Sequence, residues 1–361
     1  MNLDPTLRTL IEAAVQAPSG ENAQPWLFEA SRSQPGVLGI CIDPVRRASP
    51  YSWGDRSSYV AIGAALENII LAASQLGKRV SATYFPDPAD ATRVVRLQIT
   101  DDLNVQPDSL ASAIANRVTN RKKYKSTPLT PVERDALVGS IAGSHYARLV
   151  LTEDKKEIEE LTRAATTNEH IMLANTALHS YFFGHINWTR AEDERNKVGF
   201  YVKTLELPPP AAIGFKLMRV WKRALFLNTY LKMNKIVAGQ NATLFGAVPA
   251  MGAIVSDAES PEAAIAAGRS LERVWLTATS LGLSMQPMAG LLYLHLSVRA
   301  GEGMAFSAVE RQLIEEKATD IDRILKLNNT PTYFMFRIGR AKPPSAHAVR
   351  FSVDEVTKIV D

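Results

Sequence analysis

The spacing of apolar and polar residues predicts alternating helices and short strands. Apolar residues recur at helical spacing through 57–77 and 261–281, so one stripe of each segment is apolar. Shorter apolar runs such as 37–42 and 247–255 predict strands. We expect helices at 5–16, 57–77, 108–116, 131–142, 153–185 and 261–281, and strands at 24–30, 37–42, 79–84, 93–100, 147–152, 247–255, 284–294 and 332–339. This mixture predicts an α+β protein with two antiparallel or mixed sheets sandwiched by helices.

Two of the predicted helices are copies of one another. Residues 63–77, GAALENIILAASQLG, align without gaps on residues 268–282, GRSLERVWLTATSLG, with Gly, Leu, Glu, Leu, Ala, Leu and Gly at the same offsets. The first helix is likewise echoed by residues 130–144. A repeat of this length indicates a duplicated fold. We therefore predict a first lobe at 1–105 and a second at 106–361, with a helical insertion at 186–245.

Composition excludes several classes of protein. The 361 residues are 46% hydrophobic and 22% charged, as expected for a globular chain large enough for two cores. The opening MNLDPTLRTLIEAAVQ lacks the basic start and apolar run of a signal peptide, and no apolar run reaches the roughly 20 residues of a membrane span. Cys41 is the only cysteine, which excludes internal disulfides and suits the cytoplasm. The six histidines show no ligand spacing, so we predict no metal site.

Residues 17–26, APSGENAQPW, crowd turn formers and carboxamides into ten positions. Such a turn either connects a helix to a strand or cradles a flat, hydrogen-bonding ligand. The second copy of the repeat has AGSHYA at this place, so the turn occurs in one half only.

The segment RVTNRKKY places Arg117, Thr119 and Arg121 at alternate positions, which in an extended chain face the same side. Guanidinium groups and a hydroxyl at this spacing suit a phosphate, although a solvated basic loop or a nucleic-acid patch would show the same residues.

Two further stretches carry candidate ligand groups. In GLSMQPMAGLLY, residues 282–293, a helix end passes into a turn that would either present backbone amides to a ligand or simply lead to a strand. After the strand that ends near Gly339, the tail carries Arg340, Lys342 and Arg350.

Together these stretches resemble the flavin-dependent nitroreductase family, and specifically its fused two-lobed, Acg-type branch. The resemblance covers nearly the whole chain outside the insertion. It implies a nitroreductase-like fold duplicated in one chain, a monomeric pseudo-dimer with one complete flavin mononucleotide (FMN) site. The family supplies the turn and the arginine segment from different subunits, and here they come from different lobes. The residues that the resemblance assigns to FMN are Pro18, Ser19, Gly20, Asn22, Arg117, Thr119, Arg121, Gln286, Pro287, Met288, Ala289, Gly290 and Arg350, with Arg340 and Lys342 as weaker phosphate candidates.

The resemblance also implies an activity. NADH or NADPH would reduce the flavin at N5, and a nitroaromatic, a quinone or another small organic acceptor would reoxidise it in the same pocket. Because the cofactor performs the redox chemistry, we assign no catalytic side chain. The alternatives are a non-enzymatic protein that stores FMN beneath a lid and a specialised flavin oxidase or dehydrogenase of a natural product. None of these roles involves nucleic acid.

The insertion has an unusual charge. No acidic residue occurs from Leu207 to Ser256, whereas six basic residues do, namely Lys216, Arg219, Lys222, Arg223, Lys232 and Lys235. A basic, aromatic helix at 214–236 suits a lid over the flavin, a membrane-surface helix or a partner-binding face. We favour the lid, because long insertions in compact domains often cover active sites.

Overall fold

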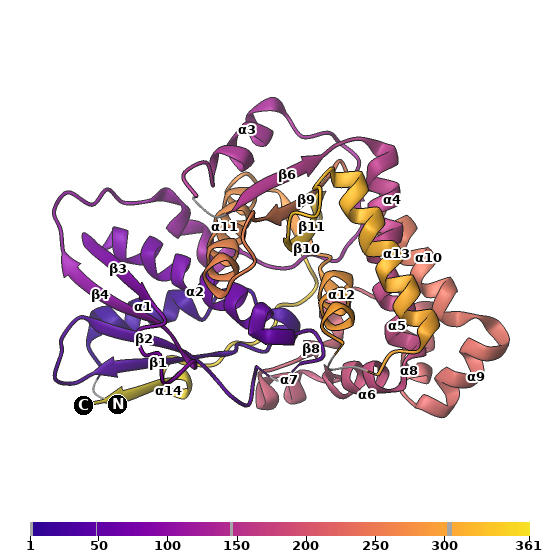
Figure 1. The fold of residues 1–361 in the computed structure, drawn as a ribbon, viewed down its shortest axis with the longest axis horizontal. Coiled ribbons are helices and arrows are strands. Elements are labelled where there is room, and N and C mark those ends of the chain that lie inside the picture. Colours follow the sequence, from indigo (N-terminus) through magenta and orange to yellow (C-terminus); the bar gives the residue numbers. More distant parts are fainter. Residues whose placement is uncertain (1–2, 48, 145–146, 302–304) are drawn as a thin grey trace.

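The computed structural model describes residues 3–47, 49–144, 147–301 and 305–361, so His145 and Tyr146 of the AGSHYA sequence lie outside the described residues. Two sheets lie at either side of a central pair of long helices, α2 and α11 (Figure 1). The elements of the first lobe are α1 (Pro5–Ala14), η1 (Gly20–Asn22), β1 (Trp26–Ser31), β2 (Val37–Ile42), η2 (Trp53–Asp55), α2 (Arg56–Gln75), β3 (Lys78–Tyr84) and β4 (Arg93–Asp101), and η3 (Ser109–Asn116) follows the predicted boundary at residue 105.

The second lobe contains a similar set of elements and a large helical addition. Its elements are β5 (Tyr124–Lys125), α3 (Pro131–Gly139), β6 (Arg148–Thr152), α4 (Lys155–Ala165), α5 (Thr167–Ala174), α6 (Thr176–Gly184), β7 (Ile186–Asn187), α7 (Arg190–Asn196), β8 (Phe200–Tyr201), η4 (Val202–Leu205), α8 (Pro209–Met218), α9 (Trp221–Leu231), α10 (Met233–Gly246), β9 (Ala250–Val255), α11 (Pro261–Ser280), β10 (Ser284–Pro287), α12 (Gly290–Ala300), α13 (Ala308–Leu325), β11 (Thr332–Ala341), α14 (Val353–Val356) and β12 (Thr357–Val360).

The strand order confirms the duplication. The first sheet runs β12-β1-β2-β4-β3 and the second runs β10-β11-β9-β6. In each of these four-strand sets, two strands precede the long helix and two follow it, so β1, β2, β3 and β4 correspond to β6, β9, β10 and β11. Read in these terms, the order β1-β2-β4-β3 equals β6-β9-β11-β10. Within these two sheets, every pair of the described strands is antiparallel except β1 with β12, which makes the first sheet mixed, as predicted.

The two copied helices pack against one another through equivalent glycines. A Cβ added to Gly63 would lie 2.0 Å from the carbonyl oxygen of Ile265, and one added to Gly268 would lie 2.0 Å from that of Val60. These contacts are repeat equivalents of each other, so the helices cross about a local twofold axis. The helices also end alike, since Gly77 and Gly282 adopt φ values of +63° and +70°, as helix ends in the left-handed conformation require.

Three features differ from the prediction. Residues 290–294 begin the helix α12 and do not continue a strand, and α13 was not predicted. The tail forms the short strand β12, which pairs in parallel with β1 of the other lobe's sheet.

Of the described helices, α2 alone has the length and composition of a membrane span, and 83% of that window is buried inside the fold, where it serves as a core helix.

Candidate functional site

The turn at 17–26 is held in a strained backbone conformation by its own carboxamides. Glu21, Asn22 and Gln24 have φ values of +53°, +53° and +50°, which non-glycine residues rarely adopt. The Nδ2 atom of Asn22 donates to the carbonyls of Lys197 and Val349, both at 2.9 Å, and Nε2 of Gln24 donates to Lys197 at 2.7 Å. The turn therefore joins the first lobe to the end of α7 and to the tail. Strain of this kind often accompanies functional sites.

The start of the turn is more open. Ser19 accepts a hydrogen bond from the Gln24 backbone at 3.0 Å, and Pro18 is half-buried. A Cβ added to the exposed Gly20 would meet nothing within 4 Å, so no protein group covers this position.

Arg350 brings the tail to this turn. Its Nη1 atom donates to Oδ1 of Asn22, while its Nε is buried without a hydrogen-bond partner. Burial, and after it the nearby charge of Arg117, lower the pKa of Arg350 to about 9, although the carboxylates of Glu272 and Asp193 act in the opposite direction. The structure thus assembles Asn22, Arg117 and Arg350, which lie far apart in the sequence.

Arg117 lies at the junction of the lobes. Its side chain is 2% exposed, its Nη2 donates to the carbonyl of Gln16 at 2.6 Å, and its Nε lies 3.3 Å from Oε1 of Glu272. The guanidinium also stacks over Trp275 of α11, 4.7 Å from the ring centre. Burial raises the pKa of Glu272 to about 7 despite this cation. Arg117 therefore neutralises a core carboxylate as well as facing Arg350.

Thr119 and Arg121 continue the segment in different surroundings. Thr119 forms a bridge with Met285, which places it beside the strand that leads to Gln286. Arg121 donates to the carbonyl of Thr204 at 3.1 Å and lies over Phe200, so it meets the insertion. Burial lowers the pKa of Arg121 to about 10.

Gln286 is paired with an arginine that the sequence analysis missed. Arg337 of β11 is fully buried; its Nε donates to Oε1 of Gln286 at 2.8 Å and its Nη2 to the carbonyl of Lys122 at 2.7 Å. Its Nη1 is buried without a hydrogen-bond partner, and burial lowers its pKa to about 10. The available signal was one arginine inside the apolar strand TYFMFRIG. Of the two weaker candidates, Arg340 pairs with Glu133, while Lys342 is exposed and is fixed through its backbone carbonyl, which accepts from Asn120.

The turn after Pro287 leads into α12. The backbone N–H of Met288 donates to Met335 at 2.8 Å, so the fold uses this amide. Met288 therefore has no amide left for a ligand. The amides of Ala289 and Gly290 remain candidates, because the first N–H groups of a helix have no partner within it. A Cβ added to Gly290 would lie 2.6 to 2.8 Å from the side chain of Asn168, so only glycine fits.

A cluster of buried acidic and phenolic groups adjoins this turn. Tyr181 donates to Oε2 of Glu21 at 2.5 Å, and Ser49 donates to the same oxygen at 3.1 Å. Tyr51 lies between Glu21, Glu169 and Asn168, and Asn168 in turn touches Gly290. Burial raises the pKa of Glu21, and it raises that of Glu169 to about 7, with Oε2 of Glu169 left without a partner. Glu169 therefore titrates near neutral pH, and Tyr51 and Tyr181, whose pKa values burial also raises, keep their protons in this cluster.

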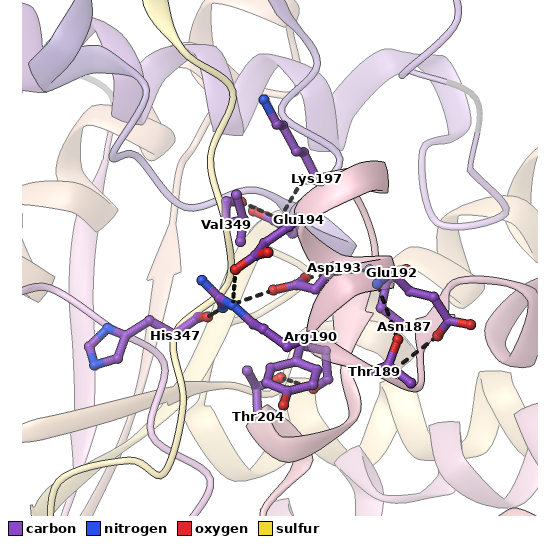
Figure 2. A network of polar contacts seen from close by, with 12 residues as sticks. Asn187, Thr189, Arg190, Glu192, Asp193, Glu194, Lys197, Thr204, His347 and Val349 are labelled. Atoms are coloured by element: carbon purple, nitrogen blue, oxygen red, sulfur yellow. Dashed lines mark hydrogen bonds and ion pairs between the residues drawn. The ribbon is translucent and has the colours of Figure 1, made fainter.

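The first part of the insertion covers the site. In this covering segment, residues 186–206, the backbone N–H of Gly199 donates to the carbonyl of Glu21 at 2.9 Å, and Nζ of Lys197 pairs with Glu355 at 2.7 Å. Figure 2 shows Arg190 of α7 bonded to Asp193 and Glu194 and to the carbonyl of His347, which fastens the tail to α7. Helices α8 to α10 instead pack on α4, α5 and α6. The lid interpretation therefore suits residues 186–206 better than the basic helix.

The chain is similar in sequence to several mycobacterial proteins. No protein-family model matches the chain. The chain is 24% identical to an uncharacterised protein of Mycobacterium tuberculosis over 97% of its own length and 48% of the relative. It is 31% identical to a putative NAD(P)H nitroreductase of that species over 34% of the chain and 36% of the relative, and 23% identical to the putative NAD(P)H nitroreductase acg over 51% and 54%.

The sequence resemblance to nitroreductases is confirmed. The chain spans about half the length, or less, of the relatives it matches. Among solved structures, the nitroreductase NfnB of Mycobacterium smegmatis covers 64% of this chain and 88% of its own at 12% identity, with a TM-score of 0.38. A BluB-like flavoprotein of Clostridium difficile covers 70% and 100% at 11% identity, also with a TM-score of 0.38. These scores are too low to assign a fold, so the architecture rests on the strand order.

The nitroreductase-like residues fall into two connected groups. Asn22, Arg117 and Arg350 meet at the lobe junction, while Thr119, Gln286 and the turn to Gly290 follow β10 beside it. Beside these groups lie residues that the sequence analysis did not identify, namely Arg337, Glu272, Asn168, Glu169, Tyr51 and Tyr181.

Proposed function

We propose that the protein is an FMN-dependent oxidoreductase that uses NADH or NADPH. The observation that carries the proposal is the meeting of Asn22 from the first lobe with Arg350 from the tail, beside Arg117. The chain thereby brings the turn and the arginine segment together from different lobes. The names of the relatives, putative NAD(P)H nitroreductases, support the same reading.

The residues present fit FMN. Arg350 and Arg337 each have a buried N–H group without a partner, and the burial of Arg121 lowers its pKa, so this region has an excess of buried positive charge. A phosphate would neutralise it through charge-assisted hydrogen bonds. The open turn at Pro18 to Gly20 and the amides that begin α12 would border the flat ring.

FMN, when bound, supplies hydride and electron transfer, here to a nitroaromatic, a quinone or another small organic acceptor. The chain would bind the phosphate with its arginines and exclude water with residues 186–206. Reduction of such acceptors also consumes protons. Glu169, whose carboxyl has a pKa of about 7, and Tyr181, bonded to Glu21, hold protons beside Gly290.

One FMN per chain and a monomeric state belong to the same proposal, because the turn occurs in the first repeat and the arginines in the second. We also place the protein in the cytoplasm, since its single cysteine suits a reducing compartment. Nucleic acid has no role in this proposal.

The test is FMN retention in variants of the arginine segment. The double variant Arg117→Ala/Arg121→Ala should lose bound FMN, whereas Lys123→Ala, an exposed neighbour, should keep it. Because Arg117 also pairs with Glu272, the variants' thermal unfolding is measured in parallel, and Arg117→Lys provides a charge-conserving comparison. A folded double variant that purifies with stoichiometric FMN would contradict the assignment.

A second candidate function is FMN storage, and the fastening of residues 186–206 favours it. Lys197 binds Glu355, and Asn22 and Gln24 bind the carbonyl of Lys197, so this cover is attached to both the turn and the tail. Anaerobic addition of NADPH or NADH separates the two functions. Prompt bleaching of the flavin absorbance supports the oxidoreductase, and an unchanged spectrum supports storage.

A further inference from the structure

Exposed apolar side chains gather on the second part of the insertion. Isolated exposed apolar residues are ordinary, but a contiguous group marks an interaction surface. Of the fourteen large hydrophobic residues exposed in the described parts of the chain, eight lie on α8, α9 and α10 or between them. They are Ile213, Leu217, Val220, Leu225, Phe226, Tyr230, Leu231 and Ile236, with Ile213, Phe226 and Tyr230 exposed to 67%, 59% and 70%.

The same helices carry only positive charge. All six basic residues between Leu207 and Ser256 are exposed, and no acidic residue lies in this stretch. Within the described ranges, none of the six forms an ion pair, although Arg219 lies over Trp188 at 5.2 Å. The surface therefore presents uncompensated cations among aromatic and aliphatic groups.

A hollow lies within this surface. It has a volume of about 300 Å³ and is lined by Leu217, Lys222, Arg223, Phe226 and Leu227. Its surface is almost entirely apolar, so Lys222 and Arg223 line it with their aliphatic chains, and their charged groups contribute to the surface around it. This arrangement suits a ligand that has both an apolar part and a negative charge.

The helices are anchored to the fold through their other side. Met218, Ala224 and Phe245 are buried, the imidazole of His179 bonds to the carbonyl of Met218 at 2.8 Å, and Phe215 packs 4.9 Å from Phe183. In Figure 1, α9 lies at the end of the molecule farthest from the first sheet. The exposed side is thus a firmly placed outer surface, remote from the lobe junction.

We propose that this outer face of α8 and α9 binds the surface of a membrane that contains anionic lipid. Helices that lie in a membrane interface combine basic residues with aromatic and aliphatic ones, which insert at the headgroup level. Each basic residue near an anionic surface contributes favourably to the free energy of binding, and this stretch has no acidic residue that the surface would repel. Nucleic acid would use the cations but not Phe226 and Tyr230. The inference does not depend on the proposed flavin chemistry.

The test is flotation of the full chain with lipid vesicles. We expect binding to phosphatidylcholine vesicles that contain about one-third phosphatidylglycerol, weak binding to pure phosphatidylcholine, and release by salt. Neutralising two cations in Lys222→Gln/Arg223→Gln should weaken binding roughly 30-fold. Phe226→Ser/Tyr230→Ser should also weaken it, whereas Val309→Ser, at an exposed apolar site on α13, should not.

Several results would overturn the proposal. One is the absence of binding to anionic vesicles at low salt. Another is binding that both pairs of substitutions leave unchanged while thermal unfolding shows them to be folded. A dimer in light scattering that Phe226→Ser/Tyr230→Ser dissociates would assign the face to a second copy of the chain. Binding to DNA that ignores Phe226→Ser, without binding to vesicles, would assign it to nucleic acid.

Discussion

The close approach of α2 and α11 makes a quantitative prediction at Gly268. An alanine Cβ there would lie 2.0 Å from the carbonyl oxygen of Val60, whereas real Cβ contacts essentially never fall below 3.0 Å, so the helices must separate by about 1 Å. Overpacking of a core by one methyl group costs about 1–3 kcal/mol. Helix propensity alone favours alanine over glycine by about 1 kcal/mol. We expect the overpacking cost to outweigh this gain, so Gly268→Ala should lower the free energy of unfolding by up to about 2 kcal/mol net.

Gly239 of α10 provides the matched control, because it lies within a helix and an added Cβ meets nothing within 4 Å. Gly239→Ala should therefore raise the free energy of unfolding by about 0.5–1 kcal/mol. Urea unfolding followed by the fluorescence of Trp26 and Trp275, both buried, measures both variants.

The equivalent variant Gly63→Ala should behave like Gly268→Ala, because its Cβ would approach Ile265 equally closely. The double variant should cost less than the sum of the two, since helices already separated by one methyl group admit the second more easily. A Gly268→Ala protein stabilised as much as the Gly239→Ala protein would refute the close helix crossing, because the full propensity gain would then appear without a packing cost. Strict additivity in the double variant would refute the coupling.

Three other predictions concern the site. The purified protein should contain one FMN per chain and be a monomer in light scattering, and two flavins per chain would contradict the asymmetric site. Burial raises the pKa of Glu169 to about 7, so between about pH 4.5 and 7 the folded state binds a proton that the unfolded state releases. The free energy of unfolding should therefore fall as pH rises through this range. Glu169→Gln should flatten that slope in urea titrations at several pH values. Glu355→Gln removes the partner of Lys197 and should speed FMN release, measured by fluorescence recovery on dilution, whereas Glu316→Gln on α13 should leave the rate unchanged.

The duplicated core could be predicted from the sequence because its signals are local. Apolar periodicity, with Gly77 and Gly282 at the ends of the two copied helices, predicts the bounds of α2 (56–75) and α11 (261–280) to within two residues. The predicted strand at 284–294 was wrong after Pro287, because the short apolar run LLYLHL is compatible with either a strand or a buried helix.

The acidic cluster could not be predicted, because it depends on tertiary contacts alone. Glu21, Tyr51, Glu169 and Tyr181 come from four separate segments, and of these only Glu21 lies in a stretch that the sequence analysis singled out. Arg350 was one of three basic candidates in the tail, and its contact with Asn22 could not be predicted because it depends on the path of the tail. Arg337 was missed because one polar residue in an apolar strand does not reveal its partners.

The pairing of β12 with β1 has a consequence for biosynthesis. Residues 357–360 complete the edge of a sheet whose other strands lie within residues 26–101. During translation, the amino-terminal half must therefore wait with one side of β1 unpaired until the carboxyl-terminal residues leave the ribosome. An unpaired strand edge readily pairs with other chains, so slow synthesis of the helical insertion prolongs exposure to aggregation. Maturation of the first lobe is thus timed by the synthesis of β12.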